Sequence, residues 1–389
     1  MTGCIVGWAH TSFGRHEGAD VESLMLEVIG AALADAGVAA KDIDRIFVGH
    51  FNAGFSRQDF PASLALQASP GLRFKPATRV ENACATGSAA IHAGLASLAA
   101  RQSRLVLVVG VEKMTDTPGP EVGANLLKAS YLKEEAGVDG GFAGIFARIA
   151  RQYFQRYGDR SDALARIAAK NHRNGVANPY AQLRKDLGYE FCRTVSEKNP
   201  MVVPPLRRTD CSLVSDGAAA LVLADSDTAL AMKKAVAFRT AEQVNDLLPM
   251  SGRDIIAFEG PRRAWAQALE HARLGLDDLS LVETQDCFTI AELIEYEAMG
   301  LTGPGEGARA IEEGWVEKEG RLPVNPSGGL KAKGHPIGAT GVSMHALAAM
   351  QLTGTAGGMQ VGDARLAGVF NMGGAAVANY VSILEPLRG

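Results

Sequence analysis

Apolar residues follow two patterns that alternate along the chain. Short runs of roughly four to eight apolar residues predict buried strands, and longer stretches with apolar residues three and four positions apart predict helices. The two patterns alternate through most of the 389 residues. Such alternation is typical of α/β folds with largely parallel sheets.

The predicted elements of the first half occur again, in the same order, in the second half. A helix followed by an acidic turn and a buried strand is predicted at residues 22–37 and 41–49, and again at residues 262–275 and 277–284. Self-similarity of this kind indicates a duplicated architecture.

A glycine-rich loop that opens a helix of small residues comes later in each half. The two loops begin at Cys84 and His335, and each is followed by a further strand, at residues 104–110 and 365–370. A duplicated fold brings equivalent loops together at one site. We therefore expect Cys84 and His335 to lie close together.

The repeat is interrupted between the two halves. Residues 113–204 are rich in Gly, Pro, Arg and Lys, and we predict that they form an inserted loop domain. The first half then comprises residues 1–112 and 205–233, with residues 215–224 returning to its sheet as a strand. The second half comprises residues 234–389.

Charge and composition narrow the class of protein. The chain has 39 basic and 43 acidic side chains, a formal net charge of -4 and no long run of one sign, which argues against a nucleic-acid or membrane-surface partner. Its N-terminus lacks the pattern of a signal peptide, and no apolar run approaches the roughly 20 residues of a spanning helix. We expect a soluble, cytoplasmic protein.

The five cysteines do not predict a disulfide framework. They are odd in number and widely spaced, and no CxxC pair suggests a zinc site. We predict free thiols in a reducing compartment and no metal. Cys4, Cys192 and Cys211 are interpreted as structural, because free cysteine is among the most often buried residue types.

Cys84 is the candidate nucleophile. It lies where a strand-like segment gives way to a helix of small residues, and a thiol at a helix N-terminus faces unpaired N–H groups and the positive end of the helix dipole. Both effects favour the thiolate, so we expect a lowered pKa. The local pattern alone fits a buried structural cysteine equally well.

The surroundings of His335 decide between these alternatives. Residues 325–341, NPSGGLKAKGHPIGATG, form a glycine-rich loop in which a ligand can approach the backbone closely. They closely resemble the thiolase signature NPxGG-x-GHPxGATG. The CATGS segment at Cys84, residues 215–220 and the Gly373-Gly374 turn follow in thiolase order, so the resemblance covers essentially the whole chain.

The resemblance implies a fold and a reaction. It implies a duplicated α/β thiolase fold, two βαβαβαββ halves packed as α/β/α/β/α layers. It also implies acyl transfer through a covalent intermediate, with Cys84 as nucleophile and His335 as its base. Coenzyme A and acyl-CoA would be substrates, with no permanently bound cofactor, and the assembly would be a homodimer or homotetramer.

Two loops indicate which branch of the family this is. Gln285-Asp286-Cys287-Phe288 resembles the HDCF loop of sterol-carrier-protein-type thiolases, with Gln285 in place of His, and residues 110–114 and 178–182 are similar to that branch. The chain ends directly after its last strand, so no appended sterol-carrier domain is expected. Asn371 stands where familiar thiolases carry their second catalytic cysteine.

The remaining site residues follow from this branch. Cys287 is expected to serve as the second catalytic thiol; the alternative is a core cysteine at the start of a helix. By analogy, His335 and a water held by the residue 285 side chain form one oxyanion hole, and the backbone N–H groups of Cys84 and Gly373 form the other. His50 and His172 match no catalytic loop and are interpreted as structural or exposed.

Several rivals use the same scaffold. Ketoacyl synthases and hydroxymethylglutaryl-CoA synthases also carry a cysteine nucleophile, but the GHP and QDCF loops favour a thiolase. A retro-aldolase of steroid side-chain breakdown is a closer rival, although the intact Cys84 and His335 argue against it. The alternative outside catalysis is a scaffold that channels acyl groups between partners.

Overall fold

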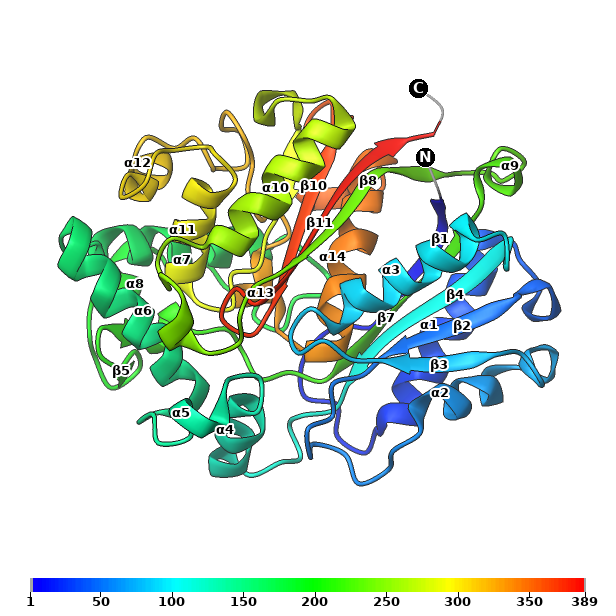
Figure 1. The fold of residues 1–389 in the computed structure, drawn as a ribbon, viewed down its shortest axis with the longest axis horizontal. Helices are drawn as coiled ribbons and strands as arrows, with labels where there is room; N and C mark the ends of the chain where they lie inside the picture. The colour runs from blue at the N-terminus through cyan, green and yellow to red at the C-terminus, as the bar shows by residue number, and fades with distance from the viewer. Residues whose placement is uncertain (1–2, 388–389) are drawn as a thin grey trace.

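The computed structural model describes residues 3–387, and its centre is a mixed nine-stranded sheet in the order β3-β2-β4-β7-β1-β8-β11-β10-β9 (Figure 1). The strands of the first half are β1 (Cys4–His10), β2 (Arg45–Gly49), β3 (Ala77–Val80), β4 (Leu105–Glu112) and β7 (Gly217–Ala224). Those of the second half are β8 (Val236–Asn245), β9 (Leu281–Glu283), β10 (Ala367–Gly373) and β11 (Ala378–Pro386).

The pairing of the strands confirms the duplication. In the first half, β1 pairs with β7 and β7 with β4, both antiparallel, and β4 pairs with β2 in parallel. In the second half, β8 pairs with β11 and β11 with β10, both antiparallel, and β10 pairs with β9 in parallel. The counterpart of β3 shrinks to one bridge between Val282 and Val324. The expectation of a largely parallel sheet was wrong, because β7 in the first half and β11 in the second half each run antiparallel to both neighbouring strands.

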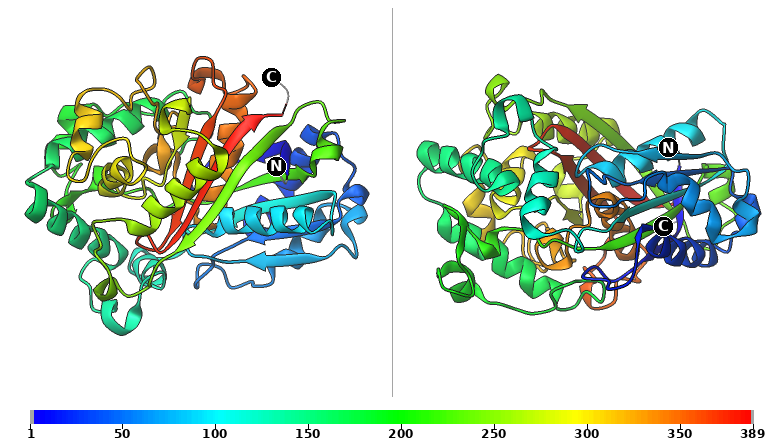
Figure 2. Two further views of the ribbon diagram at one scale, coloured as in Figure 1. Left: turned by 45° about the horizontal axis from the view of Figure 1, so that its top comes forward. Right: turned by 90° about the horizontal axis from the view of Figure 1, so that it is seen from below.

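The two half-sheets join edge to edge through a short antiparallel pairing. Cys4 pairs with Ala237 and Ile5 with Val236, at the start of β1 and β8. Figure 2 shows the two half-sheets turned strongly against each other about this junction.

Helices cover the sheet in the expected layers. α3 (Thr86–Ala99) and α14 (Ile337–Leu352) pack against each other between the half-sheets, α1 (Val21–Ala36) covers the outer face of the first, and α10 (Glu259–Ala272) covers the second (Figure 1). Alternate residues of β4 divide between two cores: Val106 and Val108 pack on the α3 side, and Leu107 and Val109 on the α1 side.

The central helices approach through glycine. A Cβ atom at Gly87 of α3 would lie 2.7 Å from the backbone nitrogen of Val342 in α14, and one at Gly110 of β4 would lie 2.4 Å from the carbonyl oxygen of Gly338. This close contact explains why the helices that follow both predicted loops are composed of small residues.

Residues 113–204 contain helices and one short strand. These are α4 (Gly119–Leu127), α5 (Leu132–Glu135), α6 (Gly141–Tyr157), α7 (Ser161–Gly175), α8 (Tyr189–Arg193) and β5 (Met201–Val203), which pairs with β6 (Leu206–Arg207). They gather on one side of the molecule, green in Figure 1. The domain boundaries proposed from the sequence stay a prediction.

The remaining helices are short or lie around the second half. They are α2 (Pro61–Leu64), α9 (Ser226–Ala229), α11 (Thr289–Ala298), α12 (Gly307–Glu312) and α13 (Gly329–Lys333). Within residues 3–387, no helix combines the length and apolar character that crossing a bilayer requires.

Candidate active site

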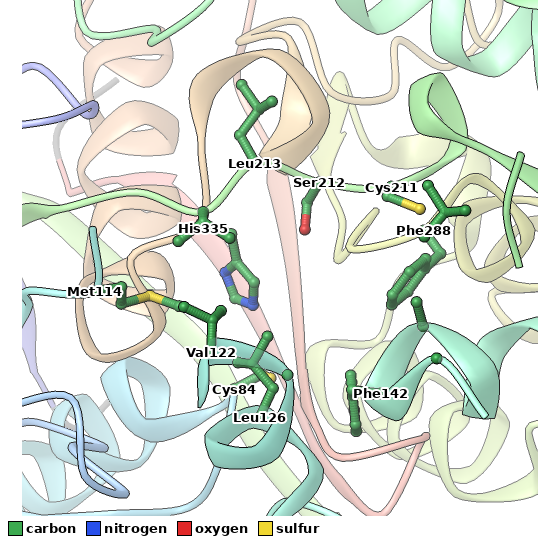
Figure 3. A pocket seen from close by; sticks show the side chains of 15 residues that line it. Cys84, Met114, Val122, Leu126, Phe142, Cys211, Ser212, Leu213, Phe288 and His335 are labelled. Atoms are coloured by element: carbon green, nitrogen blue, oxygen red, sulfur yellow. The ribbon is translucent and has the colours of Figure 1, made fainter. Parts of the chain in front are cut away.

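Cys84 lies in a tight turn between β3 and α3. Ala83 adopts a positive φ of 49°, and α3 begins at Thr86, so the thiol sits just before the first turn of the helix. The side chain is buried, yet it lines a cavity that His335 also lines (Figure 3). The structure thus brings together the two residues that the duplicated loops predicted.

Burial controls the ionisation of Cys84. It raises the pKa of the thiol to about 12, against the opposing effect of the backbone N–H groups of Gly374 and of Cys84 itself. The lowered pKa expected from the helix-start position was therefore wrong. The sequence pattern identified the helix terminus but could not show how far the thiol is removed from water.

The imidazole of His335 is held in one tautomer. Its Nδ1 lies 2.6 Å from Oγ1 of Thr340, and that hydroxyl donates its own proton to the carbonyl oxygen of Pro336 at 3.0 Å. The hydroxyl oxygen therefore accepts from Nδ1–H, which leaves Nε2 unprotonated. Nε2 is buried and has no hydrogen-bond partner among residues 3–387.

Burial also keeps His335 neutral. Its pKa is lowered to about 3 by removal from water and, secondarily, by the charge of Lys333. Figure 3 shows the ring extending from its loop toward Cys84. A neutral thiol thus faces a neutral imidazole with a free basic nitrogen, which is the arrangement of a nucleophile and its general base.

The cavity around this pair is mostly apolar. Its walls come from residues 113–204, from residues 211–214 and from Phe288 at the start of α11. The ring of Phe288 stacks on that of Phe146, with ring centroids 4.4 Å apart. The large apolar side chains that line it are Met114, Val122, Leu126, Phe142, Val202, Leu213, Val214 and Phe288. Cys211, interpreted as structural from the sequence, also lines the cavity.

Cys287 is placed beside the site. It directly precedes Phe288, the N-cap residue of α11, and its backbone carbonyl accepts from the N–H of Ser212 at 2.9 Å. Burial raises the pKa of the Cys287 thiol well above its ordinary value, and the Cys84 thiol raises it further. The two sulfurs are therefore electrostatic neighbours, although Cys287 is not among the described residues that line the cavity.

Asn371 contacts both Gln285 and the segment from Cys84 to Ser88. Nδ2 of Asn371 donates to Oε1 of Gln285 at 2.6 Å and to the carbonyl oxygen of Cys84 at 3.1 Å. Oδ1 of Asn371 accepts from the hydroxyl of Ser88 at 2.7 Å. Both side chains are fully buried.

The glycine turn at the end of β10 reaches Cys84 through Gly374. The backbone N–H of Gly374 acts to lower the pKa of the Cys84 thiol, against the larger effect of burial. Gly373 packs so closely that a Cβ atom there would lie 2.4 Å from the carbonyl oxygen of Asn82. The assignment of the Gly373 N–H to an oxyanion hole stays a prediction.

Two buried carboxylates hold the loops of the site in place. Asp286 accepts from the N–H groups of Leu330 at 2.6 Å and Lys331 at 3.1 Å, and from Nδ2 of Asn171 at 2.8 Å. Burial, reinforced by nearby Glu292, raises the pKa of Asp286 to about 7. This carboxyl group ties the QDCF loop to the glycine-rich segment that leads to His335.

The buried carboxylate of Glu112 likewise joins separate segments of the chain near the site. It accepts from the N–H groups of Phe51, Asn52 and Gly338, each at 3.0 Å. No sequence pattern marked Glu112 or Asp286 as a site residue, although both lie in segments that carry the family resemblance.

The two histidines interpreted as structural lie outside the cavity lining. His50 is buried, with Nε2 3.2 Å from Oε1 of Glu112. His172 is buried on α7, and burial lowers its pKa to about 3.

Comparisons with known proteins match this architecture over nearly the whole chain. Residues 4–227 match the N-terminal domain of thiolases, and residues 241–386 match the thiolase C-terminal domain-like family. The chain therefore belongs to the thiolase family.

Two relatives within the family are similar to this chain over most of its length. The chain is 36% identical over 373 residues to an acetyl-CoA acetyltransferase of Methanothermobacter thermautotrophicus, covering 95% of this chain and 96% of the relative. It is 32% identical to human sterol carrier protein 2, covering 95% of this chain and 69% of the relative. The expected likeness to sterol-carrier-protein-type thiolases is confirmed.

Two solved structures share the fold at lower identity. An Ltp2-ChsH2(DUF35) aldolase superposes with a TM-score of 0.85 at 22% identity, covering 100% of this chain and 98% of that one. A monomeric SCP2-thiolase like protein type 1 from Mycobacterium smegmatis superposes with a TM-score of 0.75 at 20% identity, covering 99% of this chain and 77% of that one.

Proposed function

We propose that this chain is a thiolase-type acyl-CoA acyltransferase that forms an acyl-enzyme at Cys84. The observation that carries the proposal is that Cys84 and His335 line the same cavity, and that Nε2 of His335 has no hydrogen-bond partner within residues 3–387. Coenzyme A and acyl-CoA are the substrates, and no permanently bound cofactor takes part. The relatives named acetyl-CoA acetyltransferase support the same reaction class.

In the cleavage direction, the first step transfers an acyl group to Cys84. Nε2 of His335 takes the thiol proton as the sulfur attacks the 3-keto carbon of a 3-ketoacyl-CoA. The bond between C2 and C3 then breaks, and its electron pair leaves as the enolate of acetyl-CoA. Cys287 protonates that enolate at carbon.

The second step returns the enzyme to its starting state. The imidazolium of His335 gives its proton to the Cys287 thiolate. Neutral Nε2 of His335 then takes the thiol proton of coenzyme A as the coenzyme A sulfur attacks the acyl-enzyme thioester. The shortened acyl-CoA leaves, and the imidazolium of His335 returns its proton to Cys84. Condensation of two acyl-CoA molecules is the reverse sequence.

The apolar cavity wall supports acyl groups as the bound moiety. Side chains such as Phe142, Phe288 and Val122 offer contact area but no hydrogen-bonding groups. A coenzyme A-dependent cleavage assay over 3-ketoacyl-CoA esters of increasing length tests the function. Acylation of Cys84, detected by mass spectrometry, should accompany turnover, and no turnover at any length would contradict the proposal.

The role of Cys287 is tested separately. Cys287→Ala should leave acylation of Cys84 by acyl-CoA largely intact, because that step uses His335 as base. It should abolish exchange of substrate α-protons with solvent deuterium, since the α-proton needs its own base. Full exchange in Cys287→Ala would make Cys287 a structural residue.

The same acylation experiment separates the rivals. A retro-aldolase or an acyl-channelling scaffold would not accumulate a stoichiometric acyl-enzyme at Cys84. A cytoplasmic homodimer or homotetramer belongs to the proposal as well, because thiolases typically assemble in this way. Gel filtration with light scattering tests that part.

A further inference from the structure

Two departures from the familiar thiolase pattern lie in direct contact. Asn371 stands at the position of the late catalytic cysteine, and Gln285 stands at the position of the histidine in the HDCF loop. Nδ2 of Asn371 donates to Oε1 of Gln285 at 2.6 Å, although the two residues are 86 positions apart. The two substitutions therefore form one hydrogen-bonded unit.

The orientation of the Asn371 amide follows from its neighbours. A backbone carbonyl can only accept, so the atom 3.1 Å from the carbonyl oxygen of Cys84 is the amide nitrogen of Asn371. Its oxygen is left to accept from the Ser88 hydroxyl at 2.7 Å. Gly341 of α14 packs on this group, because a Cβ there would lie 2.5 Å from Oδ1 of Asn371.

The fixed amide of Asn371 in turn orients Gln285. Since Asn371 presents a donor, the atom of Gln285 that faces it is the carbonyl oxygen, and the Gln285 amino group turns the other way. That nitrogen, Nε2, is fully buried and has no hydrogen-bond partner within residues 3–387. Leaving a buried donor unpaired costs roughly 1–3 kcal/mol, so a second partner is expected to be supplied from outside the chain.

We propose that Asn371 is a positioning residue that fixes the Cys84 carbonyl and turns the amino group of Gln285 into a free donor for the substrate oxyanion. This inference rests on the proposed acyl transfer. Ser88, Asn371 and Gln285 act as a relay that joins the nucleophile loop to the QDCF loop. The donation reaches the oxyanion directly or through one bound water.

The decisive variant replaces the donor of Asn371 by an acceptor. In Asn371→Asp the side chain still accepts from Ser88, but a carboxylate oxygen now faces Gln285. The Gln285 amide should turn over and donate to Asp, which uses up the free donor. In Gln285→Leu that donor is absent from the start.

Two rates measured on each variant separate positioning from structural damage. Acylation of Cys84 by acetoacetyl-CoA develops an oxyanion, whereas alkylation by iodoacetamide at pH 9 does not. Loss of one oxyanion donor lowers rates by about 10²–10³-fold. We expect the ratio of acylation to alkylation to fall by about 100-fold in Asn371→Asp and in Gln285→Leu, at the low end of that range.

Coupling and rescue complete the test. In the double variant, Asn371→Asp with Gln285→Leu, the ratio of acylation to alkylation should fall no further than in the more impaired single variant, because both changes remove the same donor. Unlike Gln285→Leu, Gln285→His should acylate Cys84 at a rate within about tenfold of the wild-type rate, since a neutral imidazole retains one acceptor and one donor. Asn379→Asp is the matched control: Asn379 is a buried strand asparagine that donates only to backbone carbonyls, and its ratio should equal that of the wild type.

Three outcomes overturn this inference. The first is an unchanged ratio of acylation to alkylation in Asn371→Asp. The second is a ratio in the double variant that falls by the product of the two single effects. The third is a ratio in Asn379→Asp that falls as far as in Asn371→Asp. Failure of the proposed function is distinct from all three, because wild-type Cys84 would then alkylate but not accept an acyl group from any acyl-CoA ester.

Discussion

At Cys84 two effects act on the thiol in opposite directions. A helix N-terminus stabilises a negative charge by about 0.3–1 kcal/mol, and by at most about 2 kcal/mol in a partly buried site, which corresponds to about 1.5 pKa units or less. Full burial raises the pKa of an acidic group by up to about 3–5 units. Desolvation is the larger effect, and it raises the pKa of Cys84 from 9.0 to about 12.

This ionisation state predicts slow alkylation near neutral pH. With a pKa of about 12, only about one thiol in 10⁵ is ionised at pH 7. The rate of Cys84 alkylation by iodoacetamide should therefore rise about tenfold per pH unit between pH 7 and 10, because the thiolate is the nucleophile. Peptide mapping by mass spectrometry measures this rate, and a plateau already reached between pH 6 and 8 would contradict it.

The hydroxyl of Thr340 fixes the tautomer of His335, which predicts a specific dependence on that group. Thr340→Val keeps the volume but leaves Nδ1 of His335 without its acceptor, so the proton is free to move to Nε2, the nitrogen that we propose acts as base. Positioned proton transfer contributes about 10²–10⁴-fold, and we expect acylation of Cys84 to slow by about 10²-fold. Thr340→Ser, which keeps the hydroxyl, should retain most of the rate in a rapid-quench measurement. Equal rates in the two variants would argue against the assignment.

At the scale of elements, the loops of the candidate site are held in place by buried carboxylates. Glu112 ends β4 and accepts three backbone N–H groups, from Phe51 and Asn52 after β2 and from Gly338 at the start of α14. One side chain thus joins a strand end of the first half to the helix that follows His335.

Removing this carboxylate should destabilise the fold. Glu112→Ala leaves three buried N–H groups without an acceptor, and each such group costs about 1–3 kcal/mol. We expect the free energy of unfolding in urea to fall by about 3–5 kcal/mol, allowing for partial relaxation. Glu121→Ala, on the exposed face of α4, should change it by less than about 0.5 kcal/mol. A loss below 1 kcal/mol in Glu112→Ala would show that these groups find other partners.

The elements that the sequence predicted well are those with strong local patterns. The helices expected at residues 22–37 and 262–275 are α1 and α10, displaced by one to three residues at each end. The contacts of Glu112 and Asp286 were not predictable in this way. They join residues that are at least 44 positions apart, and such contacts leave no periodic signal in the chain.

For the molecule as a whole, the motif-bearing loops were predictable and their environment was not. Cys84 and His335 were predicted from their equivalent places in the repeat and from the resemblance of residues 325–341 to the thiolase signature. The burial that sets both pKa values depends on the packing of α3, α14 and the walls from residues 113–204 around them.

The position of the two halves relative to each other depends on the glycine contact between α3 and α14, and this predicts the outcome of adding one methyl group. In Gly87→Ala the new Cβ would lie 2.7 Å from the backbone nitrogen of Val342 and 2.8 Å from that of Gly341. Alanine favours a helix over glycine by about 1 kcal/mol, but backbone atoms cannot yield as a flexible side chain does, and overpacking costs about 1–3 kcal/mol. The clash should therefore outweigh the gain in helix propensity.

The expected result is a protein that is both less stable and slower. The free energy of unfolding of Gly87→Ala should fall by up to about 2 kcal/mol in urea, the difference between the two effects. Acylation of Cys84 should slow as well, because separating α3 from α14 moves the thiol away from His335. Gly30→Ala is the matched control, since Gly30 lies on the exposed face of α1 and a Cβ there meets no atom within 4 Å. It should gain about 0.5–1 kcal/mol and leave acylation unchanged. A stabilised and fully active Gly87→Ala would mean that the two halves can separate without disturbing the pair at the active site.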